Sequence, residues 1–129
     1  SFAGGLTAGT PLSLSLDSGS ITGMVVNASS LTLGAGHYMI SCSLGILRNS
    51  TDYTLTLDWM IRATGVQAGS KGGIDNSAEA VMGCDVANAC LTVPIGQTVD
   101  IDVVITNNSN DTMTLEASYS YLLIWRTEI

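Results

Sequence analysis

Charged residues are scarce in this chain of 129 residues, at 12% of the sequence, about half the usual share. Only four residues are basic, and the net charge is −7 at pH 7. Nucleic acids and anionic membrane surfaces are bound through clusters of basic side chains. The sequence therefore argues against both kinds of partner. No apolar run approaches the ~20 residues that span a bilayer, which argues against membrane insertion.

Cysteine and histidine are also scarce. The three cysteines are an odd number, which favours reduced thiols over a disulfide framework, although a Cys84–Cys90 bridge across a short loop stays an open alternative. His37 is the only histidine and has no close-spaced partner of the kind that metal sites use. We interpret it as a strand-edge or interface residue, and we predict no metal site, no cofactor and no catalytic residue.

The residues that are present favour strands and turns. Apolar side chains recur at every second position far more often than at every third or fourth. We expect residues 65–76, which are rich in glycine, to form a loop, and residues 78–93 to form two short strands around Asp85–Asn88. Eight to ten strands with a turn about every ten residues indicate a single all-β domain over residues 1–129, a sandwich or jelly roll. The other predicted strands alternate within residues 12–16, 21–26, 31–47, 53–65, 98–106 and 112–126.

The last strand breaks its own alternation. Through Tyr121 its apolar side chains share one face, but Leu122 and Ile124 then place apolar side chains on the other face as well. Each of these two would forfeit about 1.5–3 kcal/mol if it stayed in water. In a sandwich the core takes either Tyr119, Tyr121, Leu123 and Trp125 or the opposite set, and something else must cover the remaining face.

Three segments carry a resemblance to a known superfamily. They are GAGHYMISCSL (34–44), CLTVPIGQTVDIDVV (90–104) and ASYSYLLIWR (117–126). In this order they resemble the globular heads of the complement first-component and tumour necrosis factor superfamily, over residues 12–126. The resemblance implies a jelly-roll β-sandwich that assembles as a homotrimer.

Within that superfamily the chain is most similar to the bacteriophage versions. Low aromatic content, free thiols and turns rich in Asn, Ser, Thr and Gly are typical of those proteins, which sit at the ends of tail fibres, spikes and tail needles. The tail-needle knob of short-tailed phages is the nearest resemblance. Because the chain begins SFAGG without Met, we expect it to be the C-terminal part of a longer fibrous protein.

The resemblance suggests that neighbouring copies of the chain cover the second face of the last strand. Around a threefold axis, residues 119–125 would pack against identical strands of two neighbouring copies. We therefore predict a trimer interface that contains Tyr119, Tyr121, Leu122 and Ile124. The alternative is that a loop of the same chain covers this face.

Charged and polar side chains supply weaker candidates. Asp100 and Asp102 lie on the same face of one strand and could serve acid–base chemistry or bind Ca²⁺. Calcium sites usually gather their ligands from turns, so we interpret this pair as part of a solvated outer face. Arg62 and Arg126 present forked donors, for which we expect intersubunit ion pairs with carboxylates, with a small bound carboxylate at a subunit interface as the lesser alternative. The expected partners are Asp58, Glu116 or Glu128.

The glycine-rich segment is the candidate recognition loop. Its polar residues Ser70, Lys71, Asp75 and Asn76 suit contact with a receptor or a glycan on the bacterial surface. The same residue types also serve any turn.

These observations predict a non-enzymatic protein. We expect a structural and receptor-binding knob that caps a trimeric stem in the virion and is made in the bacterial cytoplasm. A secreted complement-type recognition or signalling head is the alternative. A hydrolase of surface polysaccharide is a third, but it would need two convergent carboxylates.

Overall fold

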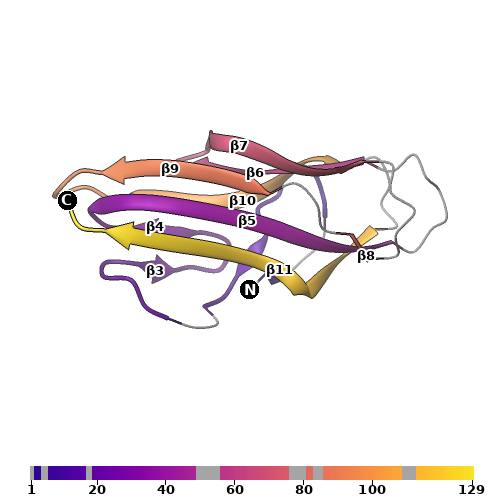
Figure 1. The fold of residues 1–129 in the computed structure, drawn as a ribbon, viewed down its shortest axis with the longest axis horizontal. Coiled ribbons are helices and arrows are strands. Elements are labelled where there is room, and N and C mark those ends of the chain that lie inside the picture. Colours follow the sequence, from indigo (N-terminus) through magenta and orange to yellow (C-terminus); the bar gives the residue numbers. More distant parts are fainter. Residues whose placement is uncertain are drawn as a thin grey trace.

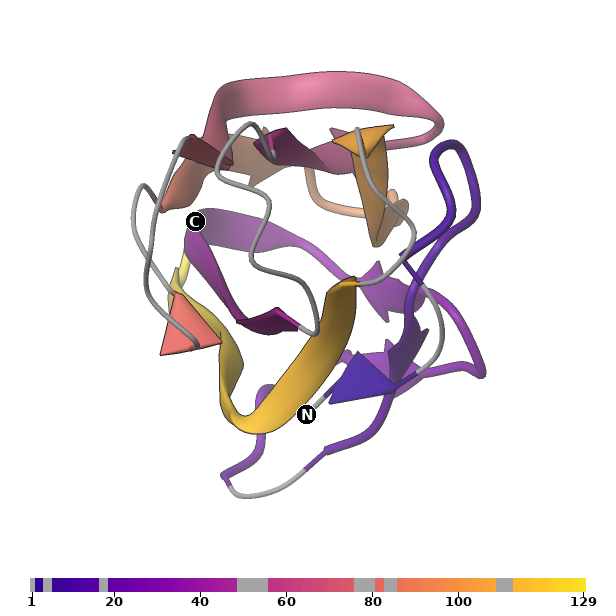
Figure 2. The same ribbon diagram turned by 90° about the vertical axis from the view of Figure 1, so that its right-hand side faces the viewer.

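The computed structural model describes residues 2–3, 6–16, 19–48, 56–75, 81–82, 86–108 and 113–129. These residues form an all-β protein built on a curled antiparallel sheet (Figures 1 and 2). The strands are β1 (Phe2–Ala3), β2 (Ser13–Leu14), β3 (Val25–Val26), β4 (Leu31–Leu33), β5 (Gly36–Arg48), β6 (Thr56–Ala63), β7 (Val66–Asp75), β8 (Val81–Met82), β9 (Ala87–Val93), β10 (Val99–Asn108) and β11 (Met113–Thr127).

The large sheet runs in the order β11-β5-β9-β7-β6-β10-β4-β3, with β8 paired to β5. In Figure 1, β11, β5 and β9 lie in front of β6, β10 and β4. Figure 2 shows the sheet curling through β7, so that its two halves face each other across one core, as in a β-sandwich. The all-β prediction is therefore confirmed. Within the described residues, no helix has the length and apolar character needed to cross a membrane.

The core is built from the inward positions of both halves. Every second residue of β5 is buried, from Tyr38 to Ile46, as the period of a strand requires. Trp59 of β6 is fully buried opposite them, and its indole Nε1 donates a hydrogen bond to the Cys42 carbonyl at 3.2 Å. Among the described residues, the other large side chains that are fully buried include Leu12, Leu33, Leu44, Leu57, Ile61, Ile101, Val103 and Ile105.

The glycine-rich segment is a strand, not the loop that its composition predicted. β6 and β7 form an antiparallel hairpin, closed by Thr64 and Gly65 between Ala63 and Val66. Gly69 has a φ of +71° and packs directly on the β9 backbone, where a side chain would collide with the Asn88 carbonyl. The glycines therefore allow close packing between strands, a use that composition alone does not distinguish from a turn.

The segment 78–93 does contain two strands, β8 and β9, as predicted. β9 begins at Ala87, inside the expected turn. Cys42 and Cys90 are free thiols, the first buried and the second exposed. Cys84 lies outside the described residues, and with it the alternative of a Cys84–Cys90 bridge.

Candidate functional site

One broad surface of the sheet leaves large apolar side chains in water. It lies on the outward side of β11, β5 and β9, and we call it the aromatic face. Residue pairing places Trp125 beside Met39, and Met39 beside Cys90, in one row across the three strands. The exposed fractions are 53% for Trp125 and 59% for Met39. The face consists of Met39, Cys90, Tyr119, Tyr121, Leu123 and Trp125.

A bulge in β11 shapes one end of the face. The pairing of β11 with β5 shifts between Glu116 and Tyr121. Inside this bulge Ser120 Oγ accepts from the Gly45 N–H at 2.9 Å and donates to the Glu116 carbonyl at 2.8 Å. Gly45 lets the bulge approach, since a Cβ there would collide with the Tyr119 Cβ. The bulge thereby holds Tyr119 over the outer side of β5, with 63% of its surface exposed.

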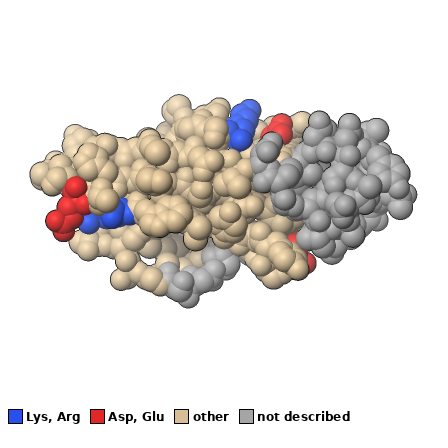
Figure 3. Space-filling model, in the orientation of Figure 1, with Lys and Arg blue, Asp and Glu red and all other residues tan. Residues whose placement is uncertain are grey.

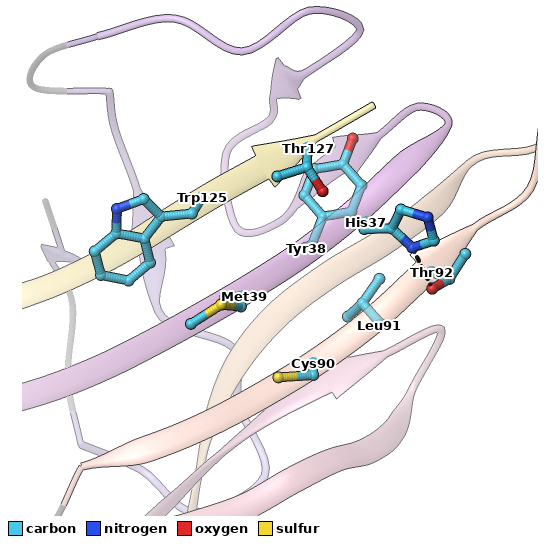
Figure 4. A pocket seen from close by; sticks show the side chains of 8 residues that line it. All are labelled: His37, Tyr38, Met39, Cys90, Leu91, Thr92, Trp125 and Thr127. Carbon is cyan, nitrogen blue, oxygen red and sulfur yellow. Dashed lines mark hydrogen bonds between the residues drawn. The ribbon is translucent and has the colours of Figure 1, made fainter. Parts of the chain in front are cut away.

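The opposite end of the face is hollowed. An open depression of about 430 Å³ lies there, and Figure 4 shows its lining from β11, β5 and β9. His37 Nδ1 lies 2.9 Å from Thr92 Oγ1, which makes this end polar, while Trp125, Met39 and Cys90 make the remainder apolar. Its shape suits a protruding apolar group that is flanked by hydrogen-bonding atoms.

Between Tyr121 and Thr127 of β11, and at the paired positions of β5 and β9, no outward side chain is charged. Those positions carry His37, Met39, Ser41 and Ser43 on β5, Asn88, Cys90 and Thr92 on β9, and Tyr121, Leu123, Trp125 and Thr127 on β11. At the bulge end of the face one carboxylate, Glu116, lies at the outward position that pairs with Gly45. Figure 3 shows the same uncharged surface, with acidic and basic groups towards its margins. In a chain of net charge −7, an uncharged apolar patch of this size is characteristic of an interaction surface.

The predicted interface residues divide between two sides of β11. Tyr119 and Tyr121 lie on the aromatic face. Leu122 and Ile124 do not: they pair with Cys42 and Ile40 and pack, half-buried, against the core of their own chain. The assignment of these two to an outer face was therefore wrong.

Ile21 and Met24, from the connection between β2 and β3, pack against the same core as Leu122 and Ile124 and line the same groove. The core side of the last strand is therefore the side of Leu122 and Ile124. The sequence placed Leu123 and Trp125 on one face with Tyr119 and Tyr121 but did not decide whether that face meets the core. The exposed fractions of 44% for Leu123 and 53% for Trp125 show that it faces outward.

Arg62 finds its partner within the chain. Its Nε and Nη2 donate to the two carboxylate oxygens of Asp102 at 2.8 and 2.6 Å. This bidentate hydrogen bonding raises the pKa of Arg62, aided by the charge of Asp102 and opposed by partial burial. Asp102 therefore takes the Nε and Nη2 donors of Arg62 within the chain, and the expected intersubunit pairs with Asp58, Glu116 or Glu128 stay a prediction.

Asp100, the other member of the predicted carboxylate pair, accepts a hydrogen bond from Thr32 Oγ1 at 2.7 Å. Both aspartates of β10 therefore hold structural partners on the outer side of the sheet. Among the described residues, no group of three His, Cys, Asp or Glu side chains could hold a metal ion.

Arg126 anchors the end of β11. Its Nε and Nη2 both donate to the Ala35 carbonyl, at 3.0 and 2.7 Å. This contact ties the C-terminal strand to the chain just before β5. It gives Arg126 a structural role within the chain, and the expected intersubunit ion pair stays a prediction.

The predicted recognition residues lie on a strand. Ser70 and Lys71 are exposed on β7, and the Ser70 hydroxyl bonds to the Asn88 backbone. Asp75 ends β7, but its side chain lies outside the described residues, as does Asn76 altogether. The predicted loop is therefore an internal strand of the sheet, on which Lys71 is exposed.

No protein-family model matches this sequence, and a search of curated proteins found no significant match.

Proposed function

We propose that the protein is a homotrimeric jelly-roll knob that caps the stem of a phage tail needle or tail fibre in the virion and contacts the host cell surface. The observation that carries the proposal is the uncharged aromatic face. In a monomer it would leave six apolar side chains in water, and a trimer offers each of them a cover. The role requires neither catalysis nor a cofactor.

The size of the face suits an interface between subunits. An aromatic side chain buries about 150–250 Å² when it is fully covered, and the three aromatic residues of the face are 40–63% exposed. With Met39, Leu123 and Cys90, the apolar part amounts to roughly 500 Å² per copy. The hydroxyl, amide and imidazole groups around it bring the total towards the ~800 Å² per partner of a standard stable interface.

The charge distribution supports a second copy of this chain as the partner. A second copy of a chain with net charge −7 is repelled wherever acidic groups meet. Since the aromatic face carries no charged side chain between Tyr121 and Thr127 of β11, with Glu116 at its bulge end, two copies can meet over most of the face without that repulsion. An acidic or basic partner protein would find no complementary charge on the same surface.

The exposed polar residues of β7 are the proposed contact with the host. β7 is an internal strand, separated from β11 by β5 and β9 in the sheet order, and it presents Lys71 and Ser70. A bacterial surface receptor or a glycan with anionic groups suits these residues. Three copies in one knob would turn a weak contact into a strong one by avidity.

Sedimentation equilibrium tests the trimer. The wild-type protein should have three times the mass of the chain at micromolar concentration. Trp125→Glu and Met39→Glu, both at exposed positions, should yield folded monomers, as checked by circular dichroism. Val66→Glu is the matched control, because Val66 is 68% exposed but lies at the β6–β7 turn, and it should remain trimeric. A wild-type monomer would refute the proposal.

Binding to bacterial cells tests the second half of the proposal. The fluorescently labelled trimer should bind to host cells, and the Trp125→Glu monomer should bind at least tenfold more weakly because avidity is lost. Lys71→Glu in the trimer should also weaken binding. Equal binding by the trimer and the monomer would contradict a gain in avidity from three copies in one knob.

A further inference from the structure

His37, the only histidine in the chain, stands at an outward position of β5 beside the aromatic face. It lines the open depression of about 430 Å³ together with Met39, Trp125 and Thr127 (Figure 4). Its Nδ1 lies 2.9 Å from the Thr92 hydroxyl oxygen, and the residue is exposed in the protomer. Histidine is the side chain that ordinarily changes its charge between pH 5 and 8. In a single copy the imidazole can therefore exchange a proton with water.

The neighbours of His37 on the adjoining strands carry no charge. Thr92 of β9 pairs with it on one side, and Thr127 of β11 pairs with it on the other. The titratable group that shares this end of the face is the exposed thiol of Cys90, and thiols ordinarily stay neutral in acid. None of these groups can balance a positive charge on the imidazole.

The charged side chains of β11 and its end are engaged elsewhere. Arg126 donates two hydrogen bonds to the Ala35 carbonyl. Glu128 follows the end of β11 and is exposed to water, where a charge pair contributes little. Glu116 pairs with Gly45 at the bulge end, about 25 Å along β5 from His37. Among the described residues of the three strands, none at this end of the face supplies a carboxylate for an imidazolium.

Cover by another copy changes the balance between the two forms of the imidazole. Trimer formation removes water from the aromatic face, and an unpaired imidazolium is unfavourable in such surroundings, whereas a neutral imidazole is tolerated. The Thr92 hydroxyl can hydrogen-bond to either form of His37 but cannot neutralise its charge. In mildly acidic solution the separate copies therefore bind more protons than the trimer does. By linkage, acid then favours the separate copies.

We propose that His37 is a pH switch of the subunit interface, and that its protonation separates the copies of the knob in mildly acidic solution. This inference rests on the proposed trimer and adds a condition under which the trimer comes apart. A free imidazole takes up its proton near pH 6.5. If the trimer holds only the neutral form, the association constant falls about tenfold per copy between pH 7.5 and pH 5.5, or about 1000-fold for three copies.

Sedimentation equilibrium at pH 7.5, 6.5 and 5.5, with the thiols kept reduced, tests the switch. The trimer association constant of the wild type should fall by about 100- to 1000-fold over this range. His37→Asn is the matched variant, because its amide can bond to the Thr92 hydroxyl from the place of Nδ1 but does not titrate. It should form the trimer at pH 7.5 and keep its association constant within about threefold at pH 5.5. Glu128→Gln should keep the pH dependence of the wild type, and circular dichroism should show that all three proteins stay folded at pH 5.5.

The proton NMR signal of the imidazole C2–H gives a second reading that needs no substitution at position 37. Because the chain has one histidine, the signal belongs to His37. In the monomeric Met39→Glu variant it should move to the imidazolium position between pH 7.5 and pH 5.5. In the wild type the imidazolium signal should appear only together with the dissociated species.

The outcomes separate the switch from the trimer. A wild-type association constant that stays level or rises towards pH 5.5 refutes the switch and leaves the trimer in place. The same fall in His37→Asn as in the wild type, or an imidazolium signal within the trimer, also refutes the role of His37. A wild-type chain that sediments as a monomer at pH 7.5 overturns the proposed trimer and the switch together.

Discussion

Leu122 and Leu123 are neighbours in β11. We predict that Leu→Ala mainly lowers the stability of the protomer at position 122 and mainly weakens trimer association at position 123. Leu122 packs half-buried against the core, and Leu→Ala at a fully buried site costs about 2–5 kcal/mol. Leu122→Ala should therefore lower the unfolding free energy of the protomer by about 1–2.5 kcal/mol. Leu123 is 44% exposed on the aromatic face, and Leu123→Ala should lower it by less than about 1 kcal/mol.

Trimer association should be weakened more by Leu123→Ala than by Leu122→Ala. Full burial of a leucine contributes about 1.5–3 kcal/mol, so covering the exposed part of Leu123 contributes about 1 kcal/mol per copy. Three copies give about 3 kcal/mol, which corresponds to a roughly hundredfold weaker trimer association constant.

Urea denaturation measures the first property, and sedimentation equilibrium measures the second. Because association stabilises the folded state, protomer stability must be measured in the monomeric Trp125→Glu background. The reasoning is refuted if Leu123→Ala destabilises that monomer as much as Leu122→Ala does, since Leu123 would then face the core. It is also refuted if Leu123→Ala leaves association unchanged.

Three further predictions concern single contacts. Burial raises the pKa of the Cys42 thiol, so the folded state keeps a proton that the unfolded state loses, and stability should fall by about 1.4 kcal/mol per pH unit above about pH 9. Urea titrations at pH 8 and pH 10 should show this fall in the wild type and not in Cys42→Ala. Asp102→Asn should cost about 1 kcal/mol, because the bidentate pair with Arg62 is partly exposed, and a thermal melt with no change would contradict the role of that pair. Gly45→Ala should cost about 1–3 kcal/mol by overpacking against Tyr119 and should weaken the trimer, whereas an unchanged melting temperature would show that the bulge can yield.

The all-β architecture could be predicted from the sequence because alternation is a local signal. The inward set of β5, from Tyr38 to Ile46, and the strand Val99–Asn108 both follow from a period of two. The side of β11 that meets the core could not be predicted, because Tyr121 and Leu122 are both apolar and only pairing with Ser43 and Cys42 decides between them.

Contacts between distant segments escaped prediction for the same reason. The partner of Arg62 is Asp102, 40 residues away on a neighbouring strand, and no local pattern selects it over other carboxylates. The glycines of β7 gave a misleading loop signal, because close packing of Gly69 on β9 and a flexible turn call for the same residue type.

Hydroxyl-radical footprinting tests most directly whether another copy covers the aromatic face. Trp125 and Met39 are 53% and 59% exposed in the protomer, while Trp59 is fully buried and serves as the internal reference. The protein concentration is raised from the range in which the chain is monomeric to the range in which the trimer forms. The oxidation of Trp125 and Met39, measured relative to that of exposed Val66 and Ile95, should then fall at least fivefold. If the oxidation of Trp125 and Met39 stays unchanged while the trimer forms, the assignment of this face to the subunit interface is contradicted.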